Sequence, residues 1–182
     1  KGYGPELIYL PEVPFDLDEM MEDVQREFHR DRKVIVCVSE GVKTADGKYI
    51  PELVGELSTD AFGHKQMGGS ATILAEYIQE KLNCKVRGIE LSLMQRSAAH
   101  VASAVDVEEA FLSGQEAVRA AISGKSDIMI GLERPADGPY ETKIKYVPLE
   151  EVANEEKCVP REWINKAGNH INQEFIDYAL PL

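Results

Sequence analysis

The sequence predicts an α/β fold, a three-layer sandwich with a mostly parallel sheet. Apolar runs typical of strands alternate along the chain with segments of helical periodicity. The run "KVIVCVSEG" at 33–41 has an unbroken apolar centre and ends at a glycine, which is typical of a strand buried on both faces of a parallel sheet. With 182 residues, 43% of them hydrophobic, the chain suits a single α/β domain over residues 1–182 with a helical C-terminal tail.

A short strand and an amphipathic helix open the predicted fold. Residues 6–10, "ELIYL", are strand formers and end before Pro11, which cannot donate to a sheet ladder. Residues 16–31 then show helical spacing and begin with Asp16, a residue type that caps helices. The apolar positions of this helix are Leu17, Met20, Met21, Val24 and Phe28. They predict a helix that packs one face on the core.

The middle of the chain predicts a helix followed by the most hydrophobic strand. A polar, glycine-containing loop leads to a helix over residues 71–83. In residues 85–93 apolar and polar side chains alternate, which indicates a strand. The strand carries an arginine at each end, Arg87 and Arg96. Two guanidiniums around an apolar strand are unusual in an acidic chain and mark this segment as a candidate for function.

The last third of the chain continues the alternation. A helical pattern covers residues 101–124 and is interrupted near Gly114. Residues 127–132 and 140–149 predict two more strands, and residues 161–180 predict a final helical stretch. The order of elements is the one expected of an α/β sandwich.

The charge balance excludes several classes of partner. A net charge of −12 leaves no basic cluster for nucleic acid or an anionic membrane. No apolar run reaches the length of a membrane span, and no signal peptide opens the chain. We therefore expect a cytoplasmic protein without nucleic-acid or membrane partners. Because the chain starts at Lys1 and enters a strand within a few residues, we also expect a fragment of a longer protein.

Candidate site residues follow the predicted strands, because ligands of open α/β sheets bind beyond the carboxyl ends of the strands. These residues are Glu12, Ser39 to Gly41, Arg96, and Glu133 with Arg134. An arginine here either pairs with a carboxylate of its own fold or holds an anionic ligand. Glu12 either caps the following helix or accepts hydrogen bonds from ligand hydroxyls. The pattern alone leaves both alternatives open.

The sequence predicts no metal site and no nucleophile. The three cysteines lack the spacing of a zinc site or a disulfide framework, so we predict structural thiols, with Cys37 buried. The histidines also lack metal-ligand spacing, and His64, in the polar loop "AFGHKQMGG", stays a candidate for ligand contact. Gly68 and Gly69 suit an anion nest at a helix start but lack the longer glycine pattern of phosphate loops.

Four segments together resemble a known family. In chain order they are "GPELIYLPEVPFD", "KVIVCVSEGVK", "DAFGHKQMGG" and "KVRGIELSLMQRSAAHVASAVDVEEAFLSG". They are similar to the carboxy-terminal half of a 6-phosphofructokinase, over roughly residues 3–133. The resemblance implies a phosphotransferase that acts on the C1 hydroxyl of fructose 6-phosphate.

The resemblance also implies roles for individual residues. Glu12 would contact the sugar, and Arg87, Gln95 and Arg96 would bind the phosphate region of the substrate. In the family the first arginine reaches into a neighbouring subunit, which implies a homo-oligomer, either a dimer or a tetramer. No catalytic residue of the family falls within this chain.

Two departures from the family pattern bear on the phosphoryl donor. Leu93 stands where ATP-dependent bacterial enzymes carry histidine and many pyrophosphate-dependent enzymes carry tyrosine, and Met94 follows it as a further candidate. Ser97-Ala98 replaces the usual Gly-Gly and resembles a pyrophosphate-dependent subgroup, as does the loop around His64. The resemblance therefore favours pyrophosphate as the donor.

Two alternatives stay open at this stage. The family's glycine-rich donor loop, its catalytic aspartate and the carboxylates that bind Mg²⁺ belong to an amino-terminal half that this chain does not contain, so we expect the chain alone to be inactive. The donor is then pyrophosphate or, alternatively, ATP. A non-catalytic regulatory domain that binds a sugar phosphate is the other hypothesis.

Overall fold

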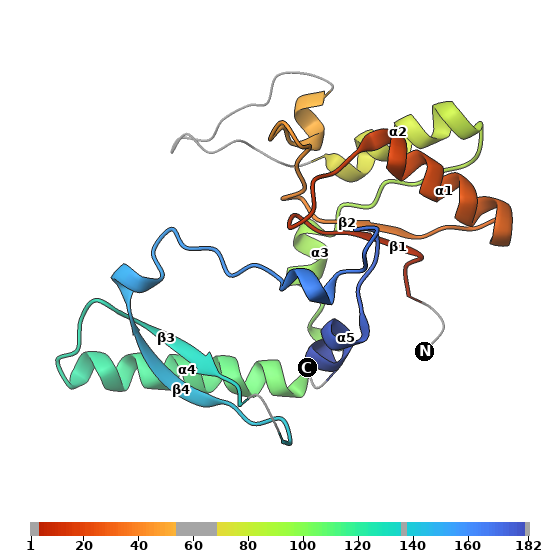
Figure 1. Cartoon of the computed structure of the whole chain (residues 1–182). Coiled ribbons are helices and arrows are strands. Elements are labelled where there is room, and N and C mark those ends of the chain that lie inside the picture. Colours follow the sequence, from red (N-terminus) through yellow and green to blue (C-terminus); the bar gives the residue numbers. More distant parts are fainter. Residues whose placement is uncertain (1–3, 54–68, 136–137, 181–182) are drawn as a thin grey trace. The chain divides into compact units, whose positions relative to one another are not determined.

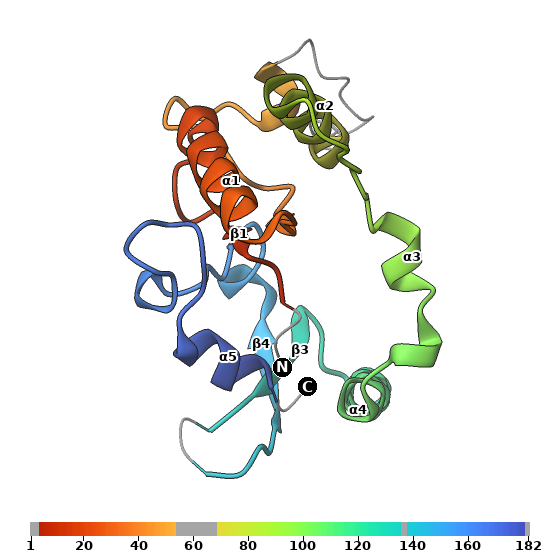
Figure 2. The same ribbon diagram turned by 90° about the vertical axis from the view of Figure 1, so that its right-hand side faces the viewer.

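The computed structural model of the chain describes residues 4–53, 69–135 and 138–180 (Figures 1 and 2). They fall into two units, each with its own helices and strands. The first unit comprises Lys1–Leu93 and Val159–Ile176, and the second comprises Met94–Cys158 and Asp177–Leu182. The prediction of one domain over residues 1–182 stays a prediction.

Two parallel strands form the sheet of the first unit. Strand β1 (Leu7–Tyr9) pairs with strand β2 (Val36–Val38), with Ile8 opposite Cys37. Parallel neighbours need a crossover connection, and helix α1 (Leu17–Asp31) provides it. The strand, helix and strand predicted at the start of the chain are confirmed.

Helix α1 has clear signals at both ends. The Asp16 carboxylate accepts hydrogen bonds from the N–H groups of Asp18 and Glu19, at 2.9 and 3.0 Å. The helix ends where Arg32 adopts the left-handed conformation, φ 57°, and donates its N–H to the carbonyl oxygen of Phe28. These ends turn the chain back toward the sheet.

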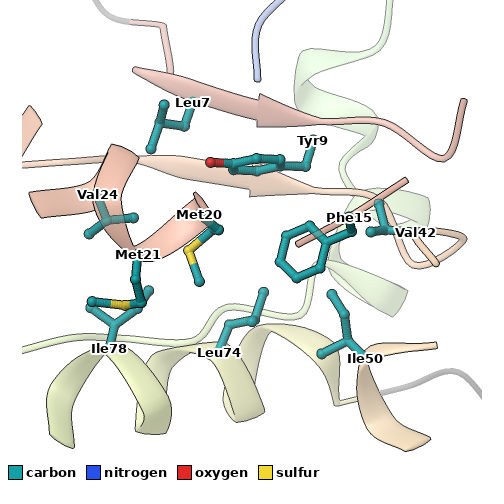
Figure 3. Close-up of a cluster of buried hydrophobic side chains, with 10 residues drawn as sticks. All are labelled: Leu7, Tyr9, Phe15, Met20, Met21, Val24, Val42, Ile50, Leu74 and Ile78. Carbon is teal, nitrogen blue, oxygen red and sulfur yellow. The ribbon is translucent and has the colours of Figure 1, made fainter. Parts of the chain in front are cut away.

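Ten buried side chains form the core of the first unit (Figure 3). They come from β1, α1, the 3₁₀ helix η1 (Ile50–Leu53), helix α2 (Ser70–Leu82) and the loops between these elements. They are Leu7, Tyr9, Phe15, Met20, Met21, Val24, Val42, Ile50, Leu74 and Ile78. A fully buried side chain of this size contributes about 1.5–3 kcal/mol, so Leu7 and Tyr9 hold β1 on this core.

Strand β2 is less buried than the sequence predicts. Val36 and Val38 pack against the core cluster. Because successive side chains of a strand point to opposite faces, Cys37 lies on the other face, where it is exposed. The prediction that Cys37 is buried and that this strand is buried on both faces is therefore wrong for the described residues.

The strand predicted over residues 85–93 is also wrong. Residues 85–91 have no regular secondary structure, and Ser92–Arg96 form a short helix, α3. A strand exists only through its pairing, and among the described residues no segment pairs with this one. Arg87 and Arg96 therefore do not mark the two ends of a strand.

The segment after α2 is held by α2 instead. A Cβ at Gly88 would lie 2.7 Å from the carbonyl oxygen of Ala71, so only glycine allows this close approach. The Glu90 carboxylate accepts a hydrogen bond from the Ala71 N–H at 2.8 Å. Both contacts fix the backbone on either side of residue 89.

The second unit consists of a helix beside a two-stranded ribbon (Figure 1). After the short 3₁₀ helix η2 (Ala99–Val101), helix α4 (Ala104–Ile122) leads to β3 (Ile128–Glu133), which pairs antiparallel with β4 (Lys143–Pro148). The two predicted strands are confirmed. The predicted interruption near residue 114 is wrong, because one glycine weakens a helix by about 1 kcal/mol without ending it. In the described part of the chain, no helix has both the length and the apolar character that a membrane span requires.

The end of the chain is mostly not helical. Two 3₁₀ turns, η3 (Leu149–Glu151) and η4 (Arg161–Trp163), precede helix α5 (Gln173–Ala179). The helix predicted over 161–180 is wrong for residues 164–172. There a turn forms, in which the Asn165 side chain accepts the N–H of Asn169 at 3.0 Å.

Candidate functional site

Glu12 follows β1 and has one carboxylate oxygen without a partner. Its Oε1 accepts a hydrogen bond from the N–H of Val159 at 2.7 Å. Its Oε2 is buried and has no hydrogen-bond partner among the described residues. Leaving a buried acceptor unpaired costs about 1–3 kcal/mol, and more for a charged one, so Oε2 is ready to accept a hydroxyl of a ligand. The alternative that Glu12 caps the next helix is wrong, because Asp16 caps it.

The turn after β2 lies beside the backbone segment that leads to Glu12. Ser39 donates its N–H to the carbonyl oxygen of Tyr9 at 3.1 Å, which extends the parallel pairing by one residue. A Cβ at Gly41 would lie 3.5 Å from the Pro11 ring. The residues predicted at the ends of the first two strands are thus brought together at one edge of the sheet.

Arg87 is exposed in the first unit and follows helix α2. Among the described residues, none forms an ion pair or a hydrogen bond with its side chain. Its neighbour Gly88 is packed against the start of α2, so the guanidinium projects from an anchored backbone.

Gln95 and Arg96 close helix α3, with Arg96 in its last turn. The Arg96 side chain is exposed and also has no ion-pair partner in the described ranges. Arg87 therefore lies on a segment without regular secondary structure, and Gln95 and Arg96 lie on a short helix rather than on a strand.

Three other arginines of this chain pair with carboxylates. Arg26 pairs with Asp23 at 2.6 Å, and Arg30 pairs with Glu27 at 2.8 Å. Arg119 pairs with Glu116 in the same way. In a chain with 32 acidic residues, Arg87 and Arg96 have neither a carboxylate nor a hydrogen-bond partner among the described residues and are available for an anionic ligand.

Three further candidates differ in what the structure shows. Leu93 and Met94 are exposed apolar side chains at the start of α3. His64 lies outside the described residues.

Arg134, another residue after a predicted strand, has a structural role instead. One of its terminal nitrogens donates to the carbonyl oxygen of Tyr178 at 2.6 Å. Its guanidinium also lies over the rings of Tyr140 and Tyr178, 4.9 and 5.2 Å from their centroids. Its neighbour Glu133 forms an exposed ion pair with Lys145 at 3.7 Å. Because of these contacts, neither Arg134 nor Glu133 is available to a ligand in the way that Arg87 and Arg96 are.

The start of α2 is not free for a phosphate group either. Gly69 precedes the helix in the left-handed conformation, φ 94°. The first-turn N–H of Ala71 is taken by the Glu90 carboxylate of the same chain. This contact argues against an anion nest at Gly69, and Gly68 lies outside the described residues.

Sequence reasoning missed a polar network next to the site. Asp23 Oδ2 accepts the hydroxyl of Tyr9 at 2.9 Å and the side-chain amide of Asn169 at 2.6 Å, while Oδ1 accepts from Arg26. The carbonyl oxygen of Asn169 also accepts the N–H of Ile8, at 2.9 Å. The network ties the turn at 165–172 to α1 and β1.

The pKa values of this network follow from its contacts. Burial alone would raise the pKa of Asp23, but hydrogen bonds from Asn169, Arg26 and Tyr9 outweigh burial and lower the pKa below its ordinary value. The pKa of the Tyr9 hydroxyl is strongly raised by burial and by its hydrogen bond to the Asp23 carboxylate. Tyr9 therefore stays protonated and acts as a hydrogen-bond donor.

These residues are suited to binding rather than to covalent chemistry. They provide a carboxylate oxygen that needs a donor, and guanidiniums that need an anion. No group of three or more His, Cys, Asp or Glu side chains that could hold a metal ion occurs within residues 4–53, 69–135 and 138–180.

The chain is similar to proteins of one family. The sequence profile described as Phosphofructokinase matches residues 2–121. The chain is 35% identical over 182 residues to the "Pyrophosphate--fructose 6-phosphate 1-phosphotransferase" of Halomonas elongata, covering 100% of this chain and 43% of that protein. It is 38% identical over 179 residues to the protein of the same name from Xanthomonas campestris pv. campestris, covering 98% and 42%.

Solved structures show the same similarity. The crystal structure of the pyrophosphate-dependent phosphofructokinase from Marinobacter aquaeolei matches with a TM-score of 0.76 and 31% identity, covering 100% of this chain and 41% of that one. The predicted α/β fold class is therefore confirmed. The chain spans less than half the length of the curated relatives it matches.

Proposed function

Because the chain belongs to the phosphofructokinase family, we propose that it is the sugar-phosphate-binding part of an enzyme that phosphorylates fructose 6-phosphate at its C1 hydroxyl, with pyrophosphate as the donor. The reaction transfers one phosphoryl group and yields fructose 1,6-bisphosphate, inorganic phosphate and a proton. Relatives named pyrophosphate--fructose 6-phosphate 1-phosphotransferase, at 35 and 38% identity, support this proposal.

The observation that carries the proposal is the unpaired Oε2 of Glu12. A buried carboxylate oxygen at the carboxyl end of β1 suits a ligand with hydroxyl donors, which a sugar supplies. A hydrogen bond to a charged acceptor contributes about 1.5–3 kcal/mol. Glu12 thereby orients the sugar without taking part in bond making.

The phosphate of the substrate is assigned to the unpaired arginines. Arg96, with Gln95 beside it, binds the phosphate in its own subunit, and Arg87 reaches the substrate of a neighbouring subunit. This assignment rests on the match to the family's Arg and Gln-Arg positions and is supported by the lack of carboxylate partners for both arginines among the described residues. A planar guanidinium binds phosphate oxygens through two parallel hydrogen bonds.

Three other residues complete the proposed substrate contacts. Leu93 and Met94 present apolar side chains at the start of α3 next to the Gln-Arg pair. His64 is kept as a polar contact of the sugar phosphate. Leu93 stands where ATP-dependent bacterial enzymes carry histidine, which supports pyrophosphate as the donor.

Mg²⁺ is implied by the family, but the described residues of this chain do not fit it. They contain no cluster of ligand side chains that could hold a cation. We therefore assign Mg²⁺ and the donor to the part of the relatives that this chain does not span, and the roles derived for this chain are binding and orientation only. We further propose a cytoplasmic homo-oligomer, a dimer or a tetramer.

The proposal is tested with a chimera in which residues 1–182 replace the matched part of the Halomonas elongata protein. Supplied with fructose 6-phosphate, Mg²⁺ and pyrophosphate, the chimera should form fructose 1,6-bisphosphate. The alternative, a non-catalytic regulatory domain, predicts a folded chimera that binds fructose 6-phosphate without turning it over. A folded chimera that neither binds nor converts the sugar phosphate contradicts both the enzyme hypothesis and the regulatory-domain hypothesis.

A further inference from the structure

Residues 159–172 lie along the edge of β1 that β2 leaves open (Figure 1). The N–H groups of successive strand residues point to opposite edges, and that of Ile8 points away from β2 and donates to the carbonyl oxygen of Asn169 at 2.9 Å. Further along the chain, the Glu12 carboxylate accepts the N–H of Val159 at 2.7 Å. We call residues 159–172 the edge segment. It contacts the chain on both sides of the carboxyl end of β1.

Hydrogen bonds within the edge segment make it one piece. The Arg161 guanidinium donates to the carbonyl oxygens of Ile164 and Asn165, both at 3.0 Å. The N–H of Asn172 donates to the carbonyl oxygen of Trp163 at 2.7 Å. A displacement at one end of the segment is therefore passed to the other end.

Asn169 anchors the edge segment to α1 as well as to β1, and only 9% of this residue is exposed. Its Nδ2 donates to Oδ2 of Asp23 at 2.6 Å. Its Oδ1 accepts from the Asn165 amide at 2.8 Å, and its N–H donates to the Asn165 side chain at 3.0 Å. With the contact to Ile8, the polar groups of Asn169 are thus engaged by the protein. Any effect of Asn169 on a ligand has to pass through its neighbours.

Gly168 brings the edge segment against the residue that follows Glu12. Its φ is 78°, and a Cβ built there would lie 2.7 Å from Cγ1 of Val13. An atom added at this distance overlaps the Val13 side chain, because protein interiors are closely packed. A methyl group at Gly168 would therefore push the edge segment away from the Glu12 backbone.

From these contacts we infer that Asn169 is a positioning residue for the sugar, acting through the Val159 N–H and Glu12. The inference rests on the proposed function, in which Oε2 of Glu12 accepts a sugar hydroxyl. With the edge segment in place, Oε1 is engaged and the carboxylate is held in one orientation before the sugar arrives. Once the segment is displaced, binding has to order the carboxylate again, which weakens the affinity. Transfer of the phosphoryl group to the bound sugar is unaffected, because Glu12 takes no part in bond making.

Two variants displace the edge segment through separate contacts. Asn169→Ala removes the anchor, and Gly168→Ala introduces the overlap with Val13. In the Halomonas elongata chimera, with pyrophosphate and Mg²⁺, each should raise KM for fructose 6-phosphate at least fivefold while kcat changes less than twofold. Gly47→Ala is the matched control, since Gly47 also has a positive φ, 82°, but a Cβ there meets nothing within 4 Å. Its KM should equal that of the parent chimera.

Hydrogen exchange without sugar tests the structural step by itself. The Val159 amide should exchange at least tenfold faster in both displaced variants than in the parent chimera and in Gly47→Ala. Circular dichroism and chemical denaturation establish that each variant is folded.

A double-mutant cycle with Glu12→Ala separates positioning from a general loss of structure. Glu12→Ala has no carboxylate to position, so adding Asn169→Ala to it should raise KM less than twofold further. An equal rise of KM in both backgrounds overturns the inference, as does an unchanged KM in both displaced variants of an active chimera. A parent chimera that neither binds nor converts fructose 6-phosphate contradicts the proposed function, and the inference then fails with it.

Discussion

The backbone N–H of Val159 donates a hydrogen bond to Oε1 of Glu12 at 2.7 Å, although the two residues are 147 positions apart. The second carboxylate oxygen stays buried and unpaired by the described residues. The contact fixes the rotamer of Glu12 and leaves one charged acceptor for a ligand.

We expect Glu12→Gln to weaken fructose 6-phosphate binding by about 1.5–3 kcal/mol, because the amide replaces a charged acceptor. Titration calorimetry on the Halomonas elongata chimera measures the effect. Glu6→Gln is the matched control, since Glu6 also accepts a backbone N–H, that of Ile35, at 2.7 Å. Equal losses of affinity in both variants would show that Glu12 acts only through the fold.

We expect Arg96→Ala in the chimera to lower kcat/KM for fructose 6-phosphate by an amount equivalent to about 2–4 kcal/mol, through the loss of a charge-assisted pair with phosphate. Steady-state kinetics with varied sugar phosphate check it. Arg32→Ala removes an exposed arginine that lies over the Phe28 ring and should leave kcat/KM unchanged. An unchanged kcat/KM for Arg96→Ala would identify it as a structural arginine.

We expect Arg87→Ala to reduce activity only in the assembled oligomer, because the family match places this arginine at the substrate site of a neighbouring subunit. Hybrid oligomers test it: Arg87→Ala subunits are mixed with Arg96→Ala subunits, each of which has low activity alone. If the arginines serve different subunits, some mixed sites retain both and activity returns to a measurable fraction. No recovery in a verified hybrid places both arginines in the same subunit's site.

We expect the chimera to use pyrophosphate and not ATP. The residues that support this expectation belong to the part that binds the phosphoryl acceptor. They are Leu93, Ser97-Ala98 and the loop around His64. Formation of fructose 1,6-bisphosphate is measured with either donor, and the unmodified Halomonas elongata protein is the reference. Because that protein supplies the donor side of the chimera, the assay is repeated with the complete reading frame that encodes this chain. Strong activity with ATP alone in that protein contradicts the donor assignment and leaves the family intact.

Asp23→Ala should lower the free energy of unfolding by about 2–4 kcal/mol, because the Tyr9 hydroxyl and the Asn169 amide lose their acceptor. Chemical denaturation of the 182-residue chain measures it. Asp31→Ala, which removes an exposed ion pair with Arg30, should cost about 0–1 kcal/mol.

The Asp23 contribution should also depend on pH. Burial would raise the pKa of Asp23, but the hydrogen bonds from Asn169, Arg26 and Tyr9 lower it below 3.8 in the folded chain. Its stabilisation is therefore present above pH 3.8 and is lost as the pH falls through the lower folded value. Asp23→Ala should lose less stability than the parent over that interval, and parallel pH profiles would contradict the role of Asp23.

Local sequence signals predicted the elements whose stability is local. Helix α1 has its cap at Asp16 and its apolar positions in register, so periodicity was sufficient to find it. Residues 7–9 and 36–38 were found because apolar runs bounded by Pro and Gly are typical of strands. Glu12 was selected as a candidate through its position after a strand, and only the structure excluded the capping alternative.

Elements that depend on distant partners were not predicted. Residues 85–91 have the composition of a strand, but pairing decides whether one forms, and the sequence does not show pairing. The turn at 165–172 is built by side-chain hydrogen bonds of Asn165 that compete with helix. Asn169 contacts Asp23 across 146 positions, so no local pattern could reveal their network.

The two contacts that hold the segment after α2 have a consequence for the entropy of ligand binding. Gly88 is pressed against the first turn of α2, and Glu90 is hydrogen-bonded to it. The backbone that carries Arg87 is therefore ordered before an anion arrives. Fixing one residue's backbone costs about 1–2 kcal/mol, so a phosphate group that meets Arg87 has to immobilise the side chain alone. An irregular segment can in this way present a guanidinium with much of the preorganisation that a strand would give.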